Sequence, residues 1–190
     1  MKKNVLIITA HPSPKGFTHK IAEAYQNASI EAGNTVELID LYKTDLKQEF
    51  LTFVDPHDMG NPNTVRDIMK KKITDASELI FVHPMWWMGP PAIMKNWLDN
   101  NLAGGFAFKY VNGKPVGLLK GRTARVFITC DGAMWLYWLI AKPFWSIWNF
   151  GILGFCGLKV KSIKVLDKKF KRTDAEKEAF LEKARMMARS

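Results

Sequence analysis

Short apolar runs alternate along the chain with stretches in which apolar residues recur at helical spacing. The runs are rich in β-branched residues and predict strands of a buried parallel sheet at 4–10, 36–41, 78–83, 122–130 and 159–166. The amphipathic stretches predict helices at 17–32, at 64–76, after Pro90-Pro91 and, from a capping box, after Thr173. Because strands and helices alternate, successive strands are expected to be parallel and joined by right-handed crossovers.

This order of elements predicts a single α/β domain over residues 1–190, built on a doubly wound, five-stranded parallel sheet. A dinucleotide-binding fold would need a GxGxxG motif after the first strand, and the chain has none there. The flavodoxin-like strand order, 2-1-3-4-5, fits five strands and a phosphate loop without that glycine signature. Lys159–Leu166 alternates basic and apolar residues, which predicts an edge strand, and Asn112-Gly113 predicts a tight hairpin turn.

Two segments show no clear period. Tyr42–Asn63 is expected to be a long loop, and loops of that length in compact domains are usually functional or mobile. Trp135–Phe155 contains four of the seven tryptophans. This aromatic block is compatible with an acceptor pocket, with a dimer interface and with buried packing.

Composition adds a strong positive charge. The net charge of +10 is compatible with anionic ligands, nucleic acid or an acidic membrane surface, but no nucleic-acid partner is expected, because that reading has only the charge behind it. Cys130 and Cys156 have apolar neighbours and no metal-binding spacing, so we expect reduced core thiols of a cytoplasmic protein. The apolar run Val5–Ala10 is too short for a signal peptide, and Lys142-Pro143 interrupts the aromatic block, so a soluble protein is expected.

Candidate chemistry gathers in the loops that follow the first, third and fourth strands, His11–Thr18, Pro84–Met88 and Thr129–Gly132. In a doubly wound sheet these loops meet at the carboxyl edge, where ligands bind. The first loop ends at a helix N-terminus, which binds phosphate, and its Ser13 and Lys15 add a hydroxyl and a charge. Trp86 and Trp87 would form a flat wall, and Gly132 would allow close approach of backbone. The pattern predicts a flat, phosphorylated cofactor, and a flavin fits best.

Plainer interpretations of the same loops remain open. The first loop is also compatible with an ordinary helix start capped by Thr18, and the tryptophans with a core or dimer contact. The four histidines lack zinc-ligand spacing, GxSxG is absent, and no carboxylate pair stands out, so no metal site or hydrolase site is expected. His11 and His83 end strands, which favours structural histidines over catalytic ones.

Three segments resemble one known family. Val5–Pro12 with Phe17-Thr18 beyond it, His83–Asp99, and Gly151–Gly157 are similar to segments of the NAD(P)H:quinone oxidoreductases of the DT-diaphorase type. That family includes bacterial quinone reductases and the small ancillary subunits of glutathione-gated potassium efflux systems. The resemblance implies a flavodoxin-like fold, a homodimer and tightly held FAD, with FMN as the alternative because related members bind it.

The resemblance also assigns residues to the flavin. The pyrophosphate and adenylate side would be held by His11, Gly16, Phe17 and Thr18. The isoalloxazine ring would be lined by Pro84, Met85, Trp86 and Trp87. The loop after the fourth strand would close over the ring with Thr129, Asp131 and Gly132.

The activity implied by the resemblance is transfer of hydride from NAD(P)H, through the flavin, to a quinone or a similar acceptor. The family usually has a tyrosine and a histidine after its Gly-Gly turn. Here the turn is Asp131-Gly132, no histidine lies between it and Pro143, and Tyr137 would take the place of the catalytic tyrosine. A second hypothesis is a flavin-binding regulatory subunit of a membrane potassium-efflux transporter, for which the basic stretch Lys159–Arg172 and the aromatic block would supply the peripheral docking surface.

Overall fold

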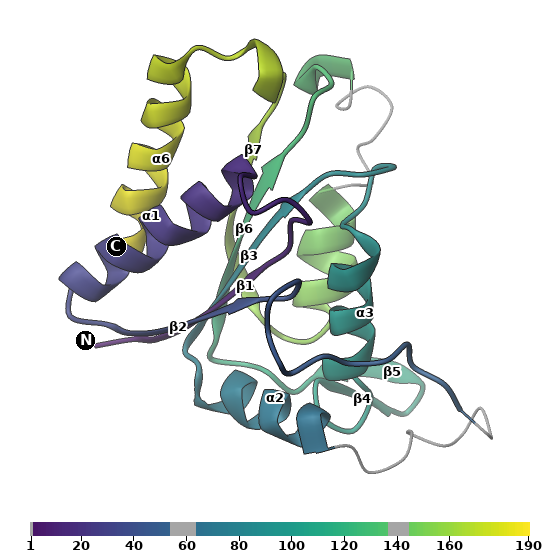
Figure 1. Ribbon diagram of the computed structural model, residues 1–190. Coiled ribbons are helices and arrows are strands. Elements are labelled where there is room, and N and C mark those ends of the chain that lie inside the picture. Colours follow the sequence, from purple (N-terminus) through teal and green to yellow (C-terminus); the bar gives the residue numbers. More distant parts are fainter. Residues whose placement is uncertain (1, 54–63, 137–144) are drawn as a thin grey trace.

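A central five-stranded sheet organises the computed structural model, which describes residues 2–53, 64–136 and 145–190. All of its strand pairs are parallel, and the order in space is β2-β1-β3-β6-β7. Counted along the chain within this sheet, that order is 2-1-3-4-5, so the predicted flavodoxin-like topology is confirmed (Figure 1). The strands span Asn4–Thr9 (β1), Thr35–Asp40 (β2), Glu78–Pro84 (β3), Thr123–Thr129 (β6) and Lys159–Leu166 (β7).

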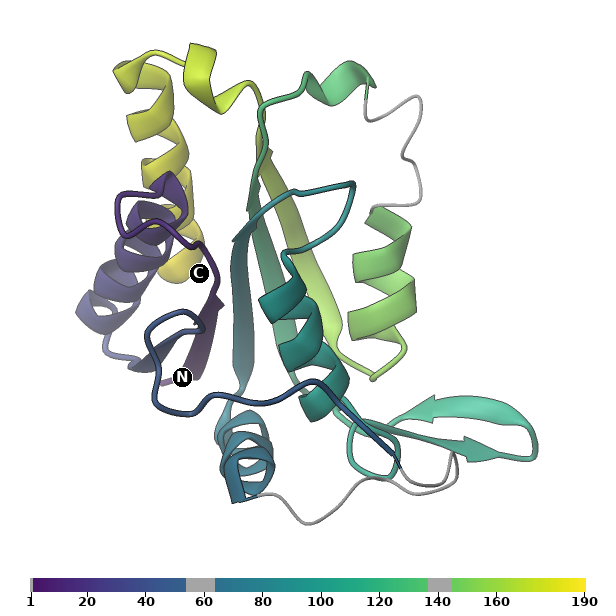
Figure 2. The ribbon, with the colours of Figure 1, turned by 45° about the vertical axis from the view of Figure 1, so that its right-hand side comes forward.

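Helices cover both faces of the sheet, because the central strands are apolar on both sides. One face carries α1 (Phe17–Glu31) and α6 (Asp174–Ala188), and the other carries α2 (Thr64–Asp75), α3 (Ala92–Asn101) and the π-helix η1 (Ile147–Gly154), as Figure 2 shows. Each face has its own apolar cluster. Every residue of β3 is buried, and this places the middle strand between the two clusters.

Several local predictions are confirmed. The basic strand β7 lies at one edge of the sheet. In the capping box of α6, the Glu176 N–H donates to Thr173 Oγ1 (3.2 Å), and the Thr173 N–H donates to Glu176 Oε2 (2.8 Å). The hairpin of β4 (Phe108–Val111) and β5 (Lys114–Gly117) turns at Asn112 and Gly113, whose φ angles are 51° and 74°. Two consecutive left-handed residues define the type I′ turn that suits Asn-Gly.

The described part of the aromatic block divides between core and surface. Trp148 is fully buried and stacks on the His83 ring, with centroids 5.2 Å apart, whereas Trp135 and Phe150 are exposed. Residues 137–144 of the block lie outside the described part of the chain. The π-helix depends on Gly154, because a Cβ atom there would lie 2.2 Å from the Asn149 carbonyl oxygen. Buried packing therefore accounts for only part of this block.

Both cysteines lie in the core, as the sequence analysis predicts. Cys130 and Cys156 are free and buried, and burial raises the pKa of each thiol to about 11. Residues 42–53 form no helix or strand, as predicted for that loop, whose remainder lies outside the described residues.

In the described part of the chain, every helix is too short or too polar to cross a membrane. The same part contains no cluster of residues able to hold a metal ion.

Candidate functional site

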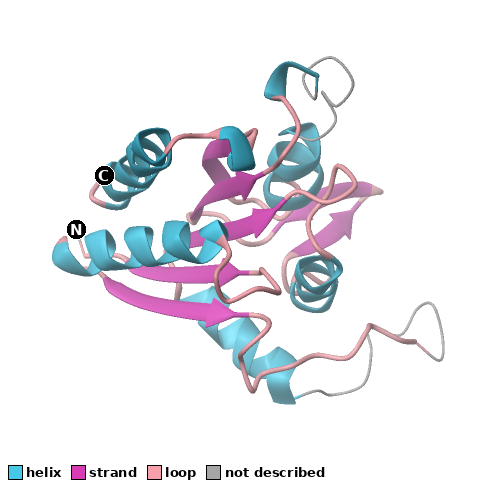
Figure 3. Ribbon diagram, turned by 45° about the horizontal axis from the view of Figure 1, so that its top comes forward, coloured by secondary structure: helices cyan, strands magenta, loops and turns pink. Residues whose placement is uncertain are grey.

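The three predicted loops meet at the carboxyl edge of the sheet (Figure 3). Direct contacts join them. The Met85 N–H donates to the Thr129 carbonyl oxygen (2.8 Å), and the Ala10 N–H donates to the Val82 carbonyl oxygen (3.0 Å). The hydroxyls of Thr18 and Thr129 lie 3.4 Å apart below the surface. Adjacent parallel strands thus bring together segments that are more than 100 residues apart in the sequence.

The first loop folds around Ser13 and presents unused backbone donors. The Ser13 N–H donates to His11 Nδ1 (3.1 Å), and the Ser13 carbonyl accepts the Gly16 N–H (3.0 Å). Helix α1 then starts at Phe17 with Gly16 as N-cap and no side-chain cap, so the interpretation of Thr18 as the cap is wrong. Among the hydrogen bonds between described residues, none uses the N–H of Phe17 or Thr18. A helix N-terminus with free N–H groups attracts anions.

Gly16 is required by the packing of this loop. A Cβ atom on Gly16 would lie 2.3 Å from His11 Nδ1, so the imidazole lies directly against the glycine backbone. Burial lowers the pKa of His11 below its ordinary value, with smaller contributions of the same sign from Lys169 and His19. A neutral ring at this point can donate or accept a single hydrogen bond without adding charge.

The second loop is a tight turn with bulky residues at its tip. Trp86 and Gly89 exchange two backbone hydrogen bonds of 2.9 Å each, and Trp87 and Met88 have φ angles of 48° and 63°. Left-handed backbone is costly for such side chains and is commonly found at functional sites. The Trp87 side chain is 100% exposed, and Trp86 is 43% exposed. Core packing is therefore excluded for Trp87.

The third loop is fixed by the segment that follows β7. The Lys169 N–H donates to the Cys130 carbonyl (3.1 Å), and the Met134 N–H donates to Asp167 Oδ2 (2.9 Å). Burial alone would raise the pKa of Asp167, but the Met134 N–H and the Arg172 guanidinium hold it below its usual value. Asp131 and Gly132 therefore lie in a braced loop.

A cavity of about 680 Å³ opens where these loops meet. Five of the predicted residues line it, namely His11, Gly16, Phe17, Trp86 and Asp131. The rest of its wall includes the four lysines Lys15, Lys20, Lys169 and Lys177, balanced in part by Asp131, Asp174 and Glu178. A cavity of this size, with cationic walls and aromatic surfaces, suits a large anionic ligand with flat rings.

Some predicted residues lie behind this cavity rather than in its wall. Thr18, Thr129, Pro84 and Met85 are buried, so their side chains support the loops. Gly132 is partly exposed. Tyr137, predicted as the catalytic residue, lies outside the described part of the chain.

Sequence reasoning missed the wall that comes from the C-terminal segment. The short 3-10 helix η2 (Lys169–Lys171) contributes Lys169 and Phe170, and α6 contributes Lys177 and Leu181. The Lys169 ammonium lies 3.7 Å from Asp131 Oδ1 and 4.2 Å from the Phe170 ring centroid. Phe170 is 80% exposed. Phe170, an aromatic residue in the middle of the basic run 168–172, was the available signal in the sequence.

His83 is a structural histidine. It is fully buried, its Nδ1–H donates to the Pro84 carbonyl (2.8 Å), and burial lowers its pKa to about 4. The uncharged ring stacks on the buried Trp148 ring, with centroids 5.2 Å apart. The predicted structural role is therefore consistent with its surroundings.

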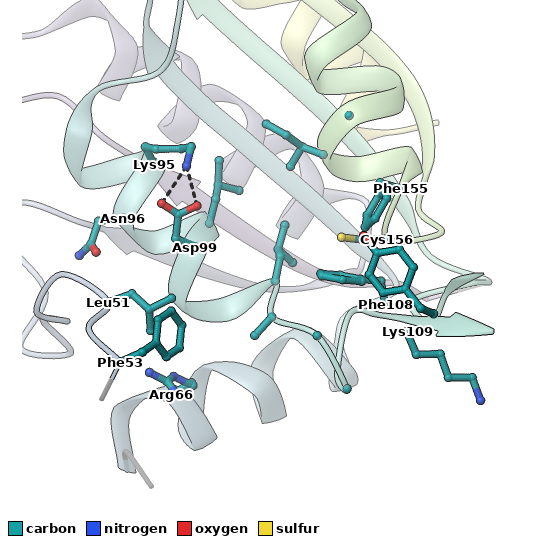
Figure 4. A pocket seen from close by; sticks show the side chains of 18 of the residues that line it. Leu51, Phe53, Arg66, Lys95, Asn96, Asp99, Phe108, Lys109, Phe155 and Cys156 are labelled. Carbon is teal, nitrogen blue, oxygen red and sulfur yellow. Dashed lines mark hydrogen bonds and ion pairs between the residues drawn. The ribbon is translucent and has the colours of Figure 1, made fainter. Parts of the chain in front are cut away.

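A larger cavity, of about 950 Å³, lies away from the three loops (Figure 4). It is formed by α3, the β4–β5 hairpin, the end of η1 and residues 50–53, with the Lys95–Asp99 ion pair of 2.6 Å on one wall. Its aromatic lining includes Phe53, Phe108 and Phe155. Of the described residues that line it, none is among the predicted cofactor residues.

The fold and the site together define a flavodoxin-like protein, and the chain belongs to the family described as having the flavodoxin-like fold, which it matches over residues 3–188. An uncharacterized NAD(P)H oxidoreductase of Haemophilus influenzae is 40% identical over 129 residues, which are 66% of this chain and 63% of that relative. An FMN-dependent NADH:quinone oxidoreductase of Exiguobacterium sp. is 32% identical over 143 residues, 63% of this chain and 64% of the relative. These matches span less than two thirds of either relative.

A solved structure extends the likeness to the whole chain. The NAD(P)H:quinone oxidoreductase from Methanothermobacter marburgensis superposes with a TM-score of 0.83 at 26% identity, covering 100% of this chain and 96% of that one. The likeness therefore includes all three loops of the site.

Proposed function

We propose that this protein is an NAD(P)H-dependent flavin oxidoreductase that reduces a quinone or a similar two-electron acceptor. The observation that carries the proposal is the cavity at the three loops, whose wall includes the start of α1, where N–H groups have no partner among the described residues, and Trp86. A flavin nucleotide has the matching chemistry, an anionic tail and a flat ring system. The names of the relatives in H. influenzae, Exiguobacterium and M. marburgensis support the reaction class.

The residues of the cavity fit a flavin in a definite direction. The N–H groups of Phe17 and Thr18, with His11 and Gly16, would hold the phosphates, and the basic wall would balance their charge. Trp86 and the exposed Trp87 would border the ring, with the buried Pro84 and Met85 holding their turn from behind. Asp131 and Gly132 would close its other side, with the buried Thr129 supporting that loop. When bound, a flavin accepts hydride from a reduced nicotinamide and passes two electrons to the acceptor. The chain orients the flat reactants, and Trp87 offers them an exposed aromatic face.

We favour FAD over FMN as the cofactor. The wall continues beyond the first loop to Phe170 on η2 and to Lys177 on α6, which leaves a cationic, aromatic region where an adenylate group would extend. Phe170 is mostly exposed, so an adenine ring would stack on the ring face that the Lys169 ammonium does not cover. The FMN-dependent relative supports the alternative, in which this region holds only solvent.

A homodimer and a cytoplasmic location complete the proposal. Phe50, Tyr110 and Phe150 are exposed near the larger cavity, and exposed aromatic residues of this kind are typical of protein interfaces. A second copy of the chain would cover them. The two free, buried thiols are typical of a reducing compartment.

The test begins with the colour of the purified protein. We expect a flavin absorption spectrum that NAD(P)H bleaches and a quinone restores, and mass analysis of the released cofactor to identify FAD. A colourless protein that takes up no added flavin would refute the proposal. A flavin-loaded protein with negligible turnover that co-purifies with a potassium-efflux transporter would instead favour the regulatory-subunit alternative.

A further inference from the structure

A buried histidine and a carboxylate lie directly behind the first loop, and the proposed function gives neither a role. His19 is the third residue of α1, and Asp40 is the last residue of β2. Both side chains are about 10% exposed, at 9% and 11%. Neither residue lines the cavity of the three loops. Their position links the start of α1 to the end of the neighbouring strand.

The contacts run in sequence from Asp40 to His11. Asp40 Oδ1 accepts the Tyr42 N–H (3.1 Å), and Oδ2 lies 3.7 Å from His19 Nδ1. On the other side of the ring, the Nε2–H of His19 donates to the Ser13 carbonyl (3.1 Å). The Ser13 N–H then donates to His11 Nδ1 (3.1 Å). One imidazole thus joins a strand end to the peptide unit that orients His11.

This arrangement determines which groups of the first loop remain free. The Ser13 carbonyl is turned inward, because it accepts from His19 Nε2 and the Gly16 N–H and also lies 3.1 Å from His11 Nδ1. With Nδ1 of His11 engaged by Ser13, Nε2 is the nitrogen left for a ligand in the cavity that His11 lines. If the inward bonds were lost, the loop would have to rearrange before its N–H groups could bind an anion together.

We propose that His19 and Asp40 are positioning residues that preorganise the first loop for the phosphate of the cofactor. This inference rests on the proposed function, since it deepens the role of the same site. The pair acts through Ser13 and His11 and makes no contact with the ligand itself. Its effect should therefore be confined to ligands that carry a phosphate.

Binding of three flavins separates this role from a general structural one. Apoprotein is titrated with riboflavin, FMN and FAD, and the quenching of flavin fluorescence is followed. We expect His19→Phe, which keeps a ring but lacks the donor, to weaken FMN and FAD binding by about tenfold and to leave riboflavin binding within about twofold of wild type. His19→Gln, which restores a donor for the Ser13 carbonyl, should recover part of the loss, and Asp40→Asn should show a smaller loss of the same kind.

Controls keep the outcomes distinct. Glu23→Gln, on the exposed side of α1, should bind all three flavins like wild type. Equal losses for riboflavin, FMN and FAD in His19→Phe and Asp40→Asn, or unchanged binding of all three, would overturn the positioning role while leaving the proposed function intact. A wild-type protein that binds no flavin would refute the proposed function itself.

Discussion

The two ends of β3 bury polar side chains in opposite ways. At the amino end, Glu78 is ion-paired with Arg125 (3.0 Å), with Lys3 at 3.6 Å and with Lys161 at 3.7 Å. At the carboxyl end, His83 is equally buried but uncharged, and its Nε2 has no hydrogen-bond partner among the described residues. One end of the strand concentrates charge, and the other excludes it.

The polar groups at the amino end of β3 stabilise the fold, whereas those at the carboxyl edge of the sheet are available to a ligand. At the amino end the opposite charges compensate one another: Lys3 Nζ lies 3.6 Å from Glu78 Oε2, and the Arg125 guanidinium also donates to the Ser190 hydroxyl (2.9 Å). At the carboxyl end the N–H groups of Phe17 and Thr18 have no hydrogen-bond partner among the described residues, and the cavity lies beside them. Free donors at a solvent-accessible edge have value for binding, whereas an unpaired charge in the interior would only destabilise.

The largest expected effect comes from breaking the charged end. Glu78→Gln would leave the buried Arg125 without its anionic partner, so we expect the free energy of unfolding to fall by about 3–5 kcal/mol in urea denaturation. Flavin affinity of the folded fraction should not change, because the cavity lies at the other end of the sheet. Glu37→Gln serves as control, since the Glu37–Lys72 pair is partly exposed and should contribute less than about 1 kcal/mol. A loss no larger than the control's would contradict the structural role of Glu78.

The next prediction tests, through the pH dependence of the free energy of unfolding, whether the buried His83 is uncharged. Burial lowers the pKa of His83 from an ordinary value near 6.5 to about 4, so between these values the unfolded chain binds a proton that the folded chain does not. Stability due to His83 is therefore complete above pH 6.5 and decreases as the pH falls, by about 3 kcal/mol at pH 4. Urea denaturation of wild type and of His83→Gln at pH 7 and pH 4 isolates this contribution. If the difference between the two proteins did not change with pH, His83 would not be the buried neutral group described here.

Much of the fold could be predicted from the sequence. The continuous apolar strands and the amphipathic helices predicted the sheet, its order and its boundaries to within about two residues. The rule that parallel strands end at a common edge predicted the meeting of the three loops. These features follow from local pattern and from topology, and both are encoded in short stretches of chain.

Other features depend on tertiary contacts that leave no local pattern. The approach of Lys169 and Phe170 to the first loop follows from the docking of β7 and α6, and the partners of Glu78 come from three separate strands or their neighbours. The left-handed turn at Trp87-Met88 carries neither glycine nor asparagine, the residues that normally signal it. Sequence reasoning therefore predicted that the three loops meet, but it could not describe the cavity wall from the C-terminal segment or the left-handed turn at Trp87-Met88.

A smaller effect tests the open donors of the carboxyl edge. Gly16→Ala would place a methyl group 2.3 Å from His11 Nδ1, so the imidazole or the loop backbone must shift from its present position. We expect FAD affinity to fall by about 10- to 100-fold, which is about 1.4–2.8 kcal/mol of binding free energy. Gly151→Ala is the matched control, because its Cβ would meet nothing closer than 3.9 Å. Unchanged FAD affinity in Gly16→Ala would show that the packing of His11 against Gly16 is not needed for binding.

The smallest expected change in stability comes from two turns that each contain two consecutive left-handed residues. The hairpin turns at Asn112-Gly113 with φ angles of 51° and 74°, and the site turns at Trp87-Met88 with 48° and 63°. Asparagine tolerates left-handed backbone far better than tryptophan, and the Trp87 side chain is fully exposed and makes no packing that would be lost. We therefore expect Trp87→Asn to raise the free energy of unfolding by about 1 kcal/mol while lowering quinone reduction, and Asn112→Trp to cost a similar amount of stability with no loss of activity. If Trp87→Asn instead lowers the free energy of unfolding, Trp87 makes stabilising contacts with another chain. The left-handed backbone at Trp87 would then not be a loss of stability that is retained for the reaction. If both expectations hold, Trp87 lowers the stability of the fold and raises the activity. Such a trade-off is typical of a functional site whose residues have a conformation that is unfavourable for stability.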